Sequence, residues 1–207
     1  MSKMKFYSIL LALVMIAVFI LQTTFPNFTE SLLLNQQAFP QIYRFITAIF
    51  LHGSLTHLIF NLFALILFGL ILEKLIGSYK FLFIFLASGI IANIISVFFY
   101  PSSLGASGAI FGIIGALTII KPLMSVWAFN LPMPLFLAAI LWAIGDILGI
   151  FYPSGIGNIA HLSGLALGLL LGIYFRFKHK EKQEISYSYK INIPESYMQD
   201  WENRFMR

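Results

Sequence analysis

Six long apolar stretches dominate the chain and leave it few ways to fold. They run over residues 6–21, 58–75, 81–100, 107–120, 135–151 and 158–175, mostly with short connections between them. In a bilayer each segment must satisfy its own backbone hydrogen bonds, so apolar stretches near spanning length form helices. A chain that is 59% hydrophobic and only 10% charged cannot be a soluble domain of this length. We therefore predict an all-α, polytopic membrane protein with six transmembrane helices.

The basic residues predict the orientation of these helices. If the sides alternate from a cytoplasmic N-terminus, all of the 13 lysines and arginines except Arg44 fall inside. We expect both termini in the cytoplasm, with a membrane domain over residues 1–178 and a polar cytoplasmic tail over residues 179–207. The first stretch has no small-x-small cleavage site and is interpreted as a retained span. The net charge of +5 follows from this asymmetry, and we expect no nucleic-acid partner.

A serine among small residues stands where a loop enters the fourth stretch. Residues 105–112 read Gly-Ala-Ser-Gly-Ala-Ile-Phe-Gly. A helix that begins at Ser107 directs free N–H groups and a positive dipole end at the hydroxyl, which suits a nucleophile and an oxyanion. Taken alone, the pattern is more often a packing patch. The glycines, among them Gly105 and Gly108, serve either use.

The depth of Ser107 follows from the length of its helix. The 14 residues from 107 to 120 span roughly 21 Å, against about 30 Å of hydrocarbon. If Lys121 marks the inner interface, Ser107 lies below the outer surface and residues 101–106 must descend to it. Non-helical backbone at that depth is tolerated where it lines a water-filled cavity. The sequence therefore predicts a sunken, hydrated pocket that is open to the outside.

Polar residues on two other helices are predicted near the same depth. His52 and His57 lie at the outer end of the second helix, where Asn61 follows His57 by one turn. His161 lies at the outer end of the sixth helix. Intramembrane polar residues are functional candidates. Each also has a plainer use, since His52 alone is more often a satisfied loop histidine and Asn61 alone more often bonds a neighbouring helix.

Glycines at helical spacing predict which helices touch. The two series are Gly108, Gly112 and Gly115 on the fourth helix and Gly164, Gly168 and Gly172 on the sixth. Small residues at this spacing let membrane helices approach closely. His161 stands at the outer end of the second series, so we expect it to face Ser107 as a general base. Phe111 is expected to pack against the imidazole and fix its orientation.

Three separated motifs resemble those of the rhomboid family of intramembrane serine proteases. They are Gly-Ala-Ser-Gly-Ala-Ile-Phe-Gly at 105–112, His-Gly-Ser-Leu-Thr-His-Leu-Ile-Phe-Asn at 52–61 and Ala-His-Leu-Ser-Gly-Leu-Ala-Leu-Gly at 160–168. The resemblance covers about the first 180 residues. It implies a dyad without a carboxylate, in which Ser107 is the nucleophile and His161 its base. It also implies that His57, Asn61 and the Ser107 N–H hold the oxyanion, and that His52 helps to hold the hydrated pocket.

One motif departs from the family pattern. The Trp-Arg pair of the first outer loop is Tyr43-Arg44 here. Arg44 is still expected to bond to carbonyl groups of that loop, and Tyr43 to lie at the interface. Residues 22–44 resemble the partly embedded loop of the family, for which we expect a structural role.

The resulting prediction is an intramembrane serine endopeptidase that cleaves transmembrane segments of membrane proteins near the outer face. We expect no cofactor and no metal, since no His-Glu-x-x-His occurs. The expected partners are transmembrane protein substrates and the lipid bilayer. We expect an integral, multi-pass protein of the cell membrane. Two alternatives stay open: a catalytically silent rhomboid-like binder of membrane helices, and a transporter or proton relay.

Three further expectations concern residues outside these motifs. Asp146 in the fifth helix is expected to bond to a nearby loop rather than to orient His161. Entry of substrate is expected to be gated by the fifth helix and residues 152–157, where Pro153, Gly155 and Gly157 interrupt the chain. A short helix is expected after Pro194, with apolar side chains near one face. These side chains are Met198, Trp201 and Phe205.

Overall fold

The structure is a computed structural model that describes residues 4–152, 155–190 and 195–206, without the side chains of residues 178–190. The chain divides into two compact units, Met1–Ile173 and Tyr174–Arg207. The first contains nearly all of the apolar helices. The second ends in a separate amphipathic helix, α10 (Glu195–Phe205), on which Met198, Trp201 and Phe205 are exposed. The helix predicted in the tail is thus present, while Pro194 lies outside the described residues.

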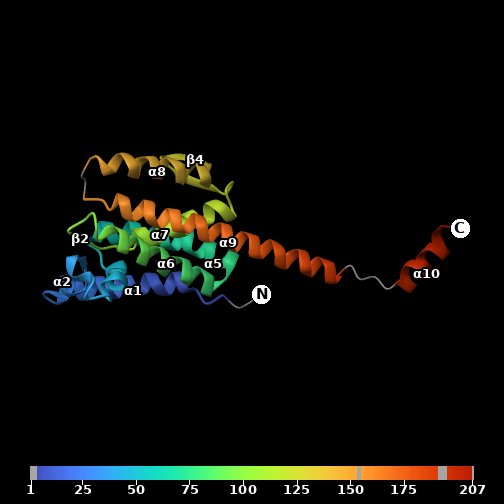
Figure 1. Cartoon of the computed structure of the whole chain (residues 1–207), viewed down its shortest axis with the longest axis horizontal. Coiled ribbons are helices and arrows are strands. Elements are labelled where there is room, and N and C mark those ends of the chain that lie inside the picture. Colours follow the sequence, from blue (N-terminus) through green and yellow to red (C-terminus); the bar gives the residue numbers. More distant parts are fainter. Residues whose placement is uncertain (1–3, 153–154, 191–194, 207) are drawn as a thin grey trace. The chain divides into compact units, whose positions relative to one another are not determined.

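The apolar stretches form helices that run side by side (Figure 1). Four helical stretches have the length and apolarity to cross a membrane: α1 (Tyr7–Thr24), the continuous run of α4 (Leu55–Ala64), η3 (Leu65–Gly69) and α5 (Leu70–Ile76), α6 (Ser78–Ser96), and the first 20 residues of α9 (Asn158–Lys190). Two further apolar helices are shorter, α7 (Ser107–Ile120) with 14 residues and α8 (Leu135–Ile150) with 16. The predicted polytopic helical membrane fold is confirmed.

The segment between α1 and α4 folds into short elements near one end of the bundle. These are α2 (Phe28–Leu32), β1 (Leu34–Asn35), η1 (Gln36–Ala38), α3 (Arg44–Thr47) and η2 (Ala48–Phe50). The buried Arg44 guanidinium donates to the carbonyl oxygens of Glu30 and Leu33, at 2.9 and 2.7 Å. Arg44 therefore bonds to loop carbonyls, as its position in the sequence predicted.

Two small antiparallel sheets depart from the all-α expectation. Strand β1 pairs with β2 (Ser102–Ser103), and β3 (Ser125–Ala128) forms a hairpin with β4 (Leu131–Pro134). The hairpin turn uses Phe129 and Asn130, which both have positive φ. Two prolines in β4 disfavour helix, and the turn lacks the Asn-Gly or Asp-Gly signal typical of hairpins. The sequence pattern therefore gave no sign of this element.

Helix α7 lies in the middle of the first unit, between α6 and α9. A Cβ atom added to Gly108 would lie 2.6 Å from the Ala92 Cβ of α6 and 3.3 Å from the Ala160 carbonyl oxygen of α9. One turn on, Gly112 meets α6 and α9 in the same way. Ile113 and Leu117 of α7 are completely buried. A helix this deeply enclosed holds its first residue, Ser107, in a fixed position.

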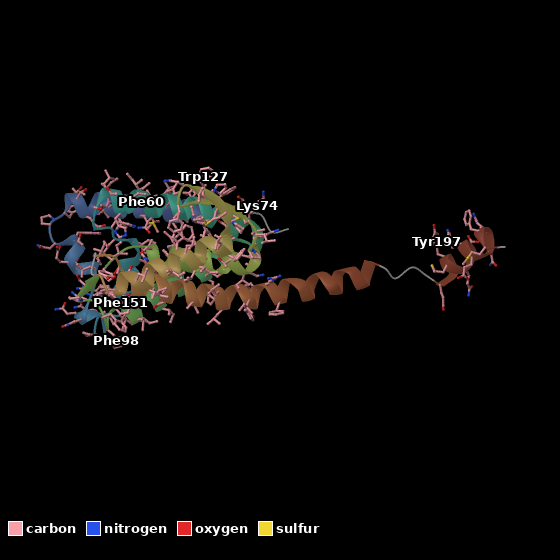
Figure 2. The ribbon with its side chains drawn as sticks, turned by 90° about the horizontal axis from the view of Figure 1, so that it is seen from above. Phe60, Lys74, Phe98, Trp127, Phe151 and Tyr197 are labelled. Atoms are coloured by element: carbon pink, nitrogen blue, oxygen red, sulfur yellow. The ribbon has the colours of Figure 1, made fainter. Side chains whose placement is uncertain are left out.

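The outside of the bundle carries large apolar side chains. Phe60, Phe98, Trp127 and Phe151 point outward from their helices and loops (Figure 2), and each has 69% or more of its surface exposed. Lys74 lies at the end of the bundle opposite Phe98 and Phe151. Because contiguous apolar surface of this kind is rare on soluble proteins, it is expected to face lipid.

Candidate active site

The loop before α7 places Ser107 at the beginning of that helix. Strand β2 is tied to β1, and the N–H of Gly105 donates to the carbonyl oxygen of Ala48 at 2.9 Å. Gly105 has φ of +124°, and a Cβ there would lie 2.7 Å from Cε1 of His57. Glycine is therefore required at position 105 both by its backbone and by the neighbouring ring. Ser107 follows at the helix N-terminus, where the first N–H groups have no partner within the helix.

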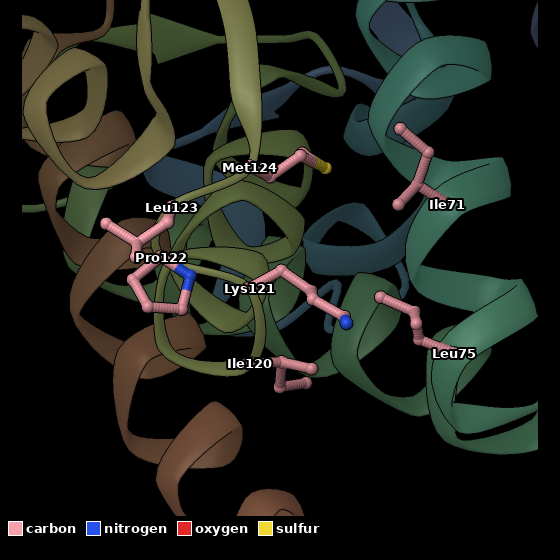
Figure 3. Close-up of a pocket in the computed structure, with 7 residues that line it drawn as sticks. All are labelled: Ile71, Leu75, Ile120, Lys121, Pro122, Leu123 and Met124. Atoms are coloured by element: carbon pink, nitrogen blue, oxygen red, sulfur yellow. The ribbon is translucent and has the colours of Figure 1, made fainter.

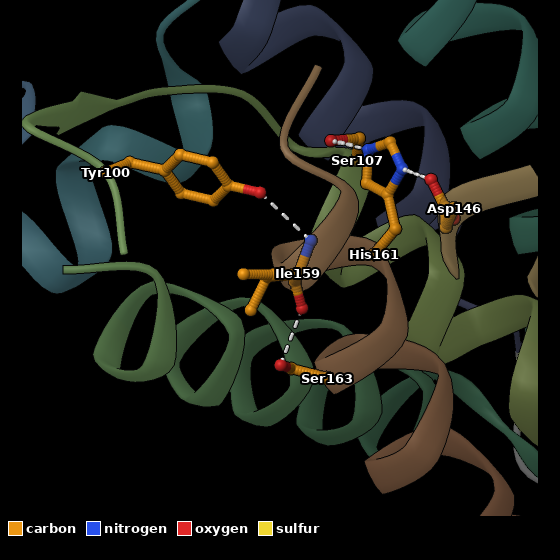
Figure 4. A network of polar contacts seen from close by, with 6 residues as sticks. All are labelled: Tyr100, Ser107, Asp146, Ile159, His161 and Ser163. Carbon is orange, nitrogen blue, oxygen red and sulfur yellow. Dashed lines mark hydrogen bonds and ion pairs between the residues drawn. The ribbon is translucent and has the colours of Figure 1, made fainter. Parts of the chain in front are cut away.

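His161 lies beside Ser107 in the first turn of α9. Its Nε2 is 2.8 Å from Oγ of Ser107, a hydrogen-bond distance (Figure 4). The ring of Phe111, one turn into α7, stacks on the imidazole with centroids 4.4 Å apart and an interplanar angle of 4°. Serine and histidine therefore meet as predicted, and Phe111 covers one face of the imidazole.

Contacts between the glycines of α7 and α9 bring Ser107 and His161 together. A Cβ on Gly164 would collide with the carbonyl oxygen of Gly108, and one on Gly168 with that of Gly112. These are backbone atoms that cannot move aside as a flexible side chain does. The backbones of α7 and α9 therefore approach to a distance that excludes any larger residue.

Asp146 of α8 contacts the other nitrogen of the same imidazole. Its Oδ1 is 3.0 Å from Nδ1 of His161 (Figure 4). An ionised carboxylate only accepts hydrogen bonds, so this contact puts the hydrogen on Nδ1 and leaves Nε2 to accept from the Ser107 hydroxyl. The expectation that Asp146 bonds to a loop is therefore wrong. Sequence spacing could not reveal the contact, because it does not show how α8 is rotated about its axis.

A further hydrogen bond, which could not be predicted from the sequence, holds the first turn of α9. The hydroxyl of Tyr100 accepts a hydrogen bond from the N–H of Ile159 at 3.1 Å (Figure 4). This N–H is one of those left unpaired at a helix start. Tyr100 was predicted inside the third helix, but α6 ends at Ser96 and frees it to reach α9. Ser163 donates to the carbonyl oxygen of Ile159 at 2.6 Å.

His57 and Asn61 lie on α4, next to the loop that leads to Ser107. The His57 ring faces Gly105, and the Asn61 amide donates to the His57 carbonyl oxygen at 2.9 Å. Among the described residues, neither side chain is hydrogen-bonded to Ser107. Their use as oxyanion donors thus stays a prediction.

His52 lies in the turn before α4, buried and edge-on to His57, with ring centroids 5.1 Å apart. The amide of Gln22 on α1 bonds to both backbone groups of His52, at 2.9 and 3.2 Å. Nε2 has no hydrogen-bond partner among the described residues. The pKa of His52 is lowered to about 4, mainly by burial and to a smaller extent by the neighbouring His57. The ring is therefore neutral at pH 7.

A cavity of about 520 Å³ lies at the far end of α7 from Ser107 (Figure 3). It is lined by Ile71, Leu75, Ile120, Lys121, Pro122, Leu123 and Met124. No side chain of the serine and histidine pair contributes to it, so the candidate site rests on the geometry at Ser107. Across the described part of the chain, no group of three His, Asp or Glu side chains is placed to hold a metal ion.

Comparison with known proteins gives a consistent match. The model of the Rhomboid domain family matches residues 40–178, which include Ser107, Asp146 and His161. The chain is 36% identical over 132 residues to RHOMBOID-like protein 6, mitochondrial, of Arabidopsis thaliana, a match that covers 63% of this chain and 42% of the relative.

Two bacterial relatives match over similar lengths. The putative rhomboid protease YdcA of Bacillus subtilis is 36% identical over 132 residues, covering 62% of this chain and 65% of the relative. The rhomboid protease GlpG of Yersinia pseudotuberculosis is 31% identical over 144 residues, covering 68% and 50%. The matches thus span between about two fifths and two thirds of these relatives.

Proposed function

The chain belongs to the rhomboid family, and from this premise we propose that it is an intramembrane serine endopeptidase. Its substrates are transmembrane segments of other membrane proteins, cut near the outer face of the bilayer. The observation that carries the proposal is the 2.8 Å distance between Oγ of Ser107 and Nε2 of His161. A serine hydroxyl becomes a useful nucleophile when a base stands within hydrogen-bond reach.

Acylation begins at the Ser107 hydroxyl. As Oγ bonds to the carbonyl carbon of the scissile peptide, its proton passes to Nε2 of His161. The same proton then moves to the leaving nitrogen as the C–N bond breaks, and the new amine end departs. Ser107 is left as an acyl ester and His161 is again neutral.

The negative charge on the carbonyl oxygen requires hydrogen-bond donors. The N–H of Ser107 lies at the positive end of the α7 dipole and is the backbone donor in this proposal. His57 beside Gly105 and Asn61 one turn later are the side-chain donors in this proposal, and the Asn61 amide has a second N–H besides the one bonded within α4. Donors that tighten only on the transition state contribute to the rate rather than to binding.

Water completes the cycle by attacking the acyl ester, with His161 as its base. Ser107 and His161 are partly exposed rather than buried, which gives water access to the site. A substrate helix must first unwind, because its backbone groups are bonded within the helix and its carbonyl carbons are covered. Segments with glycine or other helix-weakening residues near the outer interface are therefore the expected substrates.

The test is labelling of the purified protein with a fluorophosphonate, together with cleavage of a membrane substrate. Wild type is expected to be labelled and to cleave. Ser107→Ala should do neither, while His161→Ala should not cleave and should be labelled only slowly. Ser163→Ala is the matched control, since its hydroxyl donates to the α9 backbone at Ile159 and not to Ser107 or His161. Equal labelling of the wild type and both site variants would refute the proposal, and an unlabelled wild type that binds substrate would favour a silent helix binder.

A further inference from the structure

Asp146 carries a carboxylate in a helix that is otherwise apolar. The side chain is buried, with 7% of its surface exposed. Its Oδ1 meets Nδ1 of His161 at 3.0 Å, and its Oδ2 has no hydrogen-bond partner among the described residues. An acid inside a membrane is expensive and persists where it serves a partner. Here that partner is the imidazole beside Ser107.

A purely structural role would give this carboxylate other contacts. Structural carboxylates in the same fold show the difference, because Glu73 accepts hydrogen bonds from Tyr7 N, Ser8 N and Ser8 Oγ. Within the described residues, the contact of Asp146 is with His161. A buried charge with a single partner is a poor source of stability. The arrangement instead suits a carboxylate whose negative charge is balanced when the His161 imidazole takes up a proton.

Phe111 alone does not hold Nε2 of His161 toward Ser107. Its ring lies parallel to the imidazole, at an angle of 4°. A half-turn about the Cβ–Cγ bond leaves the imidazole in the same plane but exchanges Nε2 with Cε1 and Nδ1 with Cδ2, so stacking allows both orientations. A carboxylate at Nδ1 removes this ambiguity, because it binds an N–H and so assigns the other nitrogen to the serine.

We infer that Asp146 is a positioning residue for His161, and that the site works as a Ser107–His161–Asp146 array. This inference rests on the proposed protease function. Asp146 holds the hydrogen on Nδ1 and keeps Nε2 toward Oγ. When the proton leaves Ser107 for Nε2, the imidazolium gains a carboxylate partner, and Asp146 itself takes no proton. The proton then passes to the leaving amine, and the array returns to its first state.

The site of Asp146 on α8 makes its contact sensitive to the position of that helix. Apart from Asp146, the buried residues of α8 lie in its first two turns, at Leu135, Ala138 and Ala139. Movement of the far half of α8 would therefore separate Asp146 from His161. The base is correctly oriented when α8 lies against α9.

The experiment compares Asp146→Asn and Asp146→Ala with the wild type. Both remove a buried charge, so both are expected to fold. For cleavage of a transmembrane substrate in proteoliposomes, kcat is expected to fall about 10- to 100-fold, below the full effect of a general base. KM is expected to stay within about twofold, since Asp146 does not touch substrate. Fluorophosphonate labelling should slow by a factor similar to that of kcat.

Two controls separate positioning from general damage to α8. Gly145→Ala changes the adjacent position, where an added Cβ meets nothing within 4 Å, and should match the wild type. In a His161→Ala background, Asp146→Asn should cause no further loss in residual labelling, because its effect passes through the imidazole.

The outcomes distinguish the two claims. If Ser107→Ala is inactive while both Asp146 variants keep kcat within about twofold, the inference about Asp146 is overturned and the protease function stands. A loss confined to KM, or a further loss in the His161→Ala background, overturns it as well. If Ser107→Ala cleaves like the wild type, the proposed function itself fails.

Discussion

The imidazole of His161 is restrained by residues from two other helices. Phe111 of α7 covers its face, Asp146 of α8 contacts Nδ1, and Ser107 of α7 contacts Nε2. The backbone below it is fixed by Tyr100 at Ile159. A base held in this way loses little orientational freedom on reaction, which favours catalysis over mere binding.

The pairing of Ser107 with His161 could be predicted from the sequence, but Asp146 and Tyr100 could not be placed. Small residues at four-residue spacing fix which helices touch and at what depth. The rotation of α8 and the end of α6 depend instead on tertiary contacts. Asp146 reaches His161 across an interhelical contact that no periodicity records, and Tyr100 is one of several apolar residues that the hydropathy pattern joined to its helix.

His52 predicts a pH dependence of stability. Burial lowers the pKa of this histidine to about 4, against about 6.5 in the unfolded chain. Above about pH 6.5 His52 is neutral in both the folded and the unfolded chain, and its contribution to the free energy of unfolding is at its full value. As the pH drops from about 6.5 toward 4, the unfolded chain binds a proton at His52 before the folded one does, so the folded state loses stability. Over that range the loss amounts to at most about 3 kcal/mol.

The measurement is the midpoint of thermal unfolding of wild type and His52→Phe in detergent between pH 4 and 7. We expect the wild type to lose more stability on acidification than the variant. Because other groups titrate in both proteins, only the difference between the two slopes reports on His52. Parallel slopes would show that the His52 ring is hydrated and not held neutral.

At the level of elements, the proposed active site depends on the contact between α7 and α9. Gly164→Ala is expected to force these helices apart, because its Cβ would meet the Gly108 carbonyl oxygen. Overpacking of this kind costs about 1–3 kcal/mol, and a displacement of about 1 Å can lower kcat 100-fold. Both thermal stability and cleavage rate should therefore fall.

Gly145→Ala is the matched control for this substitution, since it makes the same change on an apolar helix where the added Cβ is in open space. Alanine is a better helix former than glycine, so this variant should be as stable as the wild type or more stable. Equal behaviour of the two alanine variants would argue against close packing of α7 on α9.

Helix α8 is the element for which we predicted a gate, together with residues 152–157. Pro153 lies outside the described residues, while Gly155 has φ of +73°. The second half of α8 approaches α9 at Asp146, and also at Gly149, where an added Cβ would lie 2.6 Å from the Asn158 side chain. These contacts hold the two helices together beside the active site.

A disulfide tests the gate directly, since the chain contains no cysteine. In the double variant Gly149→Cys and Asn158→Cys, oxidation should join α8 to α9. We expect cleavage of a transmembrane substrate to fall more than about tenfold, while a small fluorophosphonate still labels Ser107. Reductant should restore cleavage. Full cleavage by the oxidised protein would place substrate entry elsewhere.

At the scale of the whole molecule, the helical membrane fold could be predicted from hydropathy alone, because the bilayer permits few alternatives. The hairpin of β3 and β4 could not, since its turn is Phe129-Asn130 and its strands are apolar like the helices around them. The polar contacts of α1 with the rest of the first unit could not be predicted either. They depend on two side chains far apart in the sequence, Gln22 and Glu73.

Helix α1 is held at both ends by polar contacts. At its start no side chain of its own caps the free N–H groups, and Glu73 of α5 accepts from Tyr7 N at 2.8 Å and Ser8 N at 3.0 Å. A carboxylate at a helix N-terminus also interacts favourably with the dipole. At the other end, Gln22 bonds to the backbone of His52. The start of α1 is thus bonded to α5, and its end to the turn that precedes α4.

Glu73→Gln should therefore loosen α1 without touching Ser107 or His161. Loss of the charged acceptor is expected to cost about 1–3 kcal/mol of unfolding free energy, because an amide replaces the carboxylate beside three donors. The midpoint of thermal unfolding should fall, while the labelling rate per folded molecule at low temperature stays near that of the wild type. Glu30→Gln is the control, since the Glu30 side chain is exposed. An unchanged midpoint for Glu73→Gln would mean that apolar packing alone holds α1 in place.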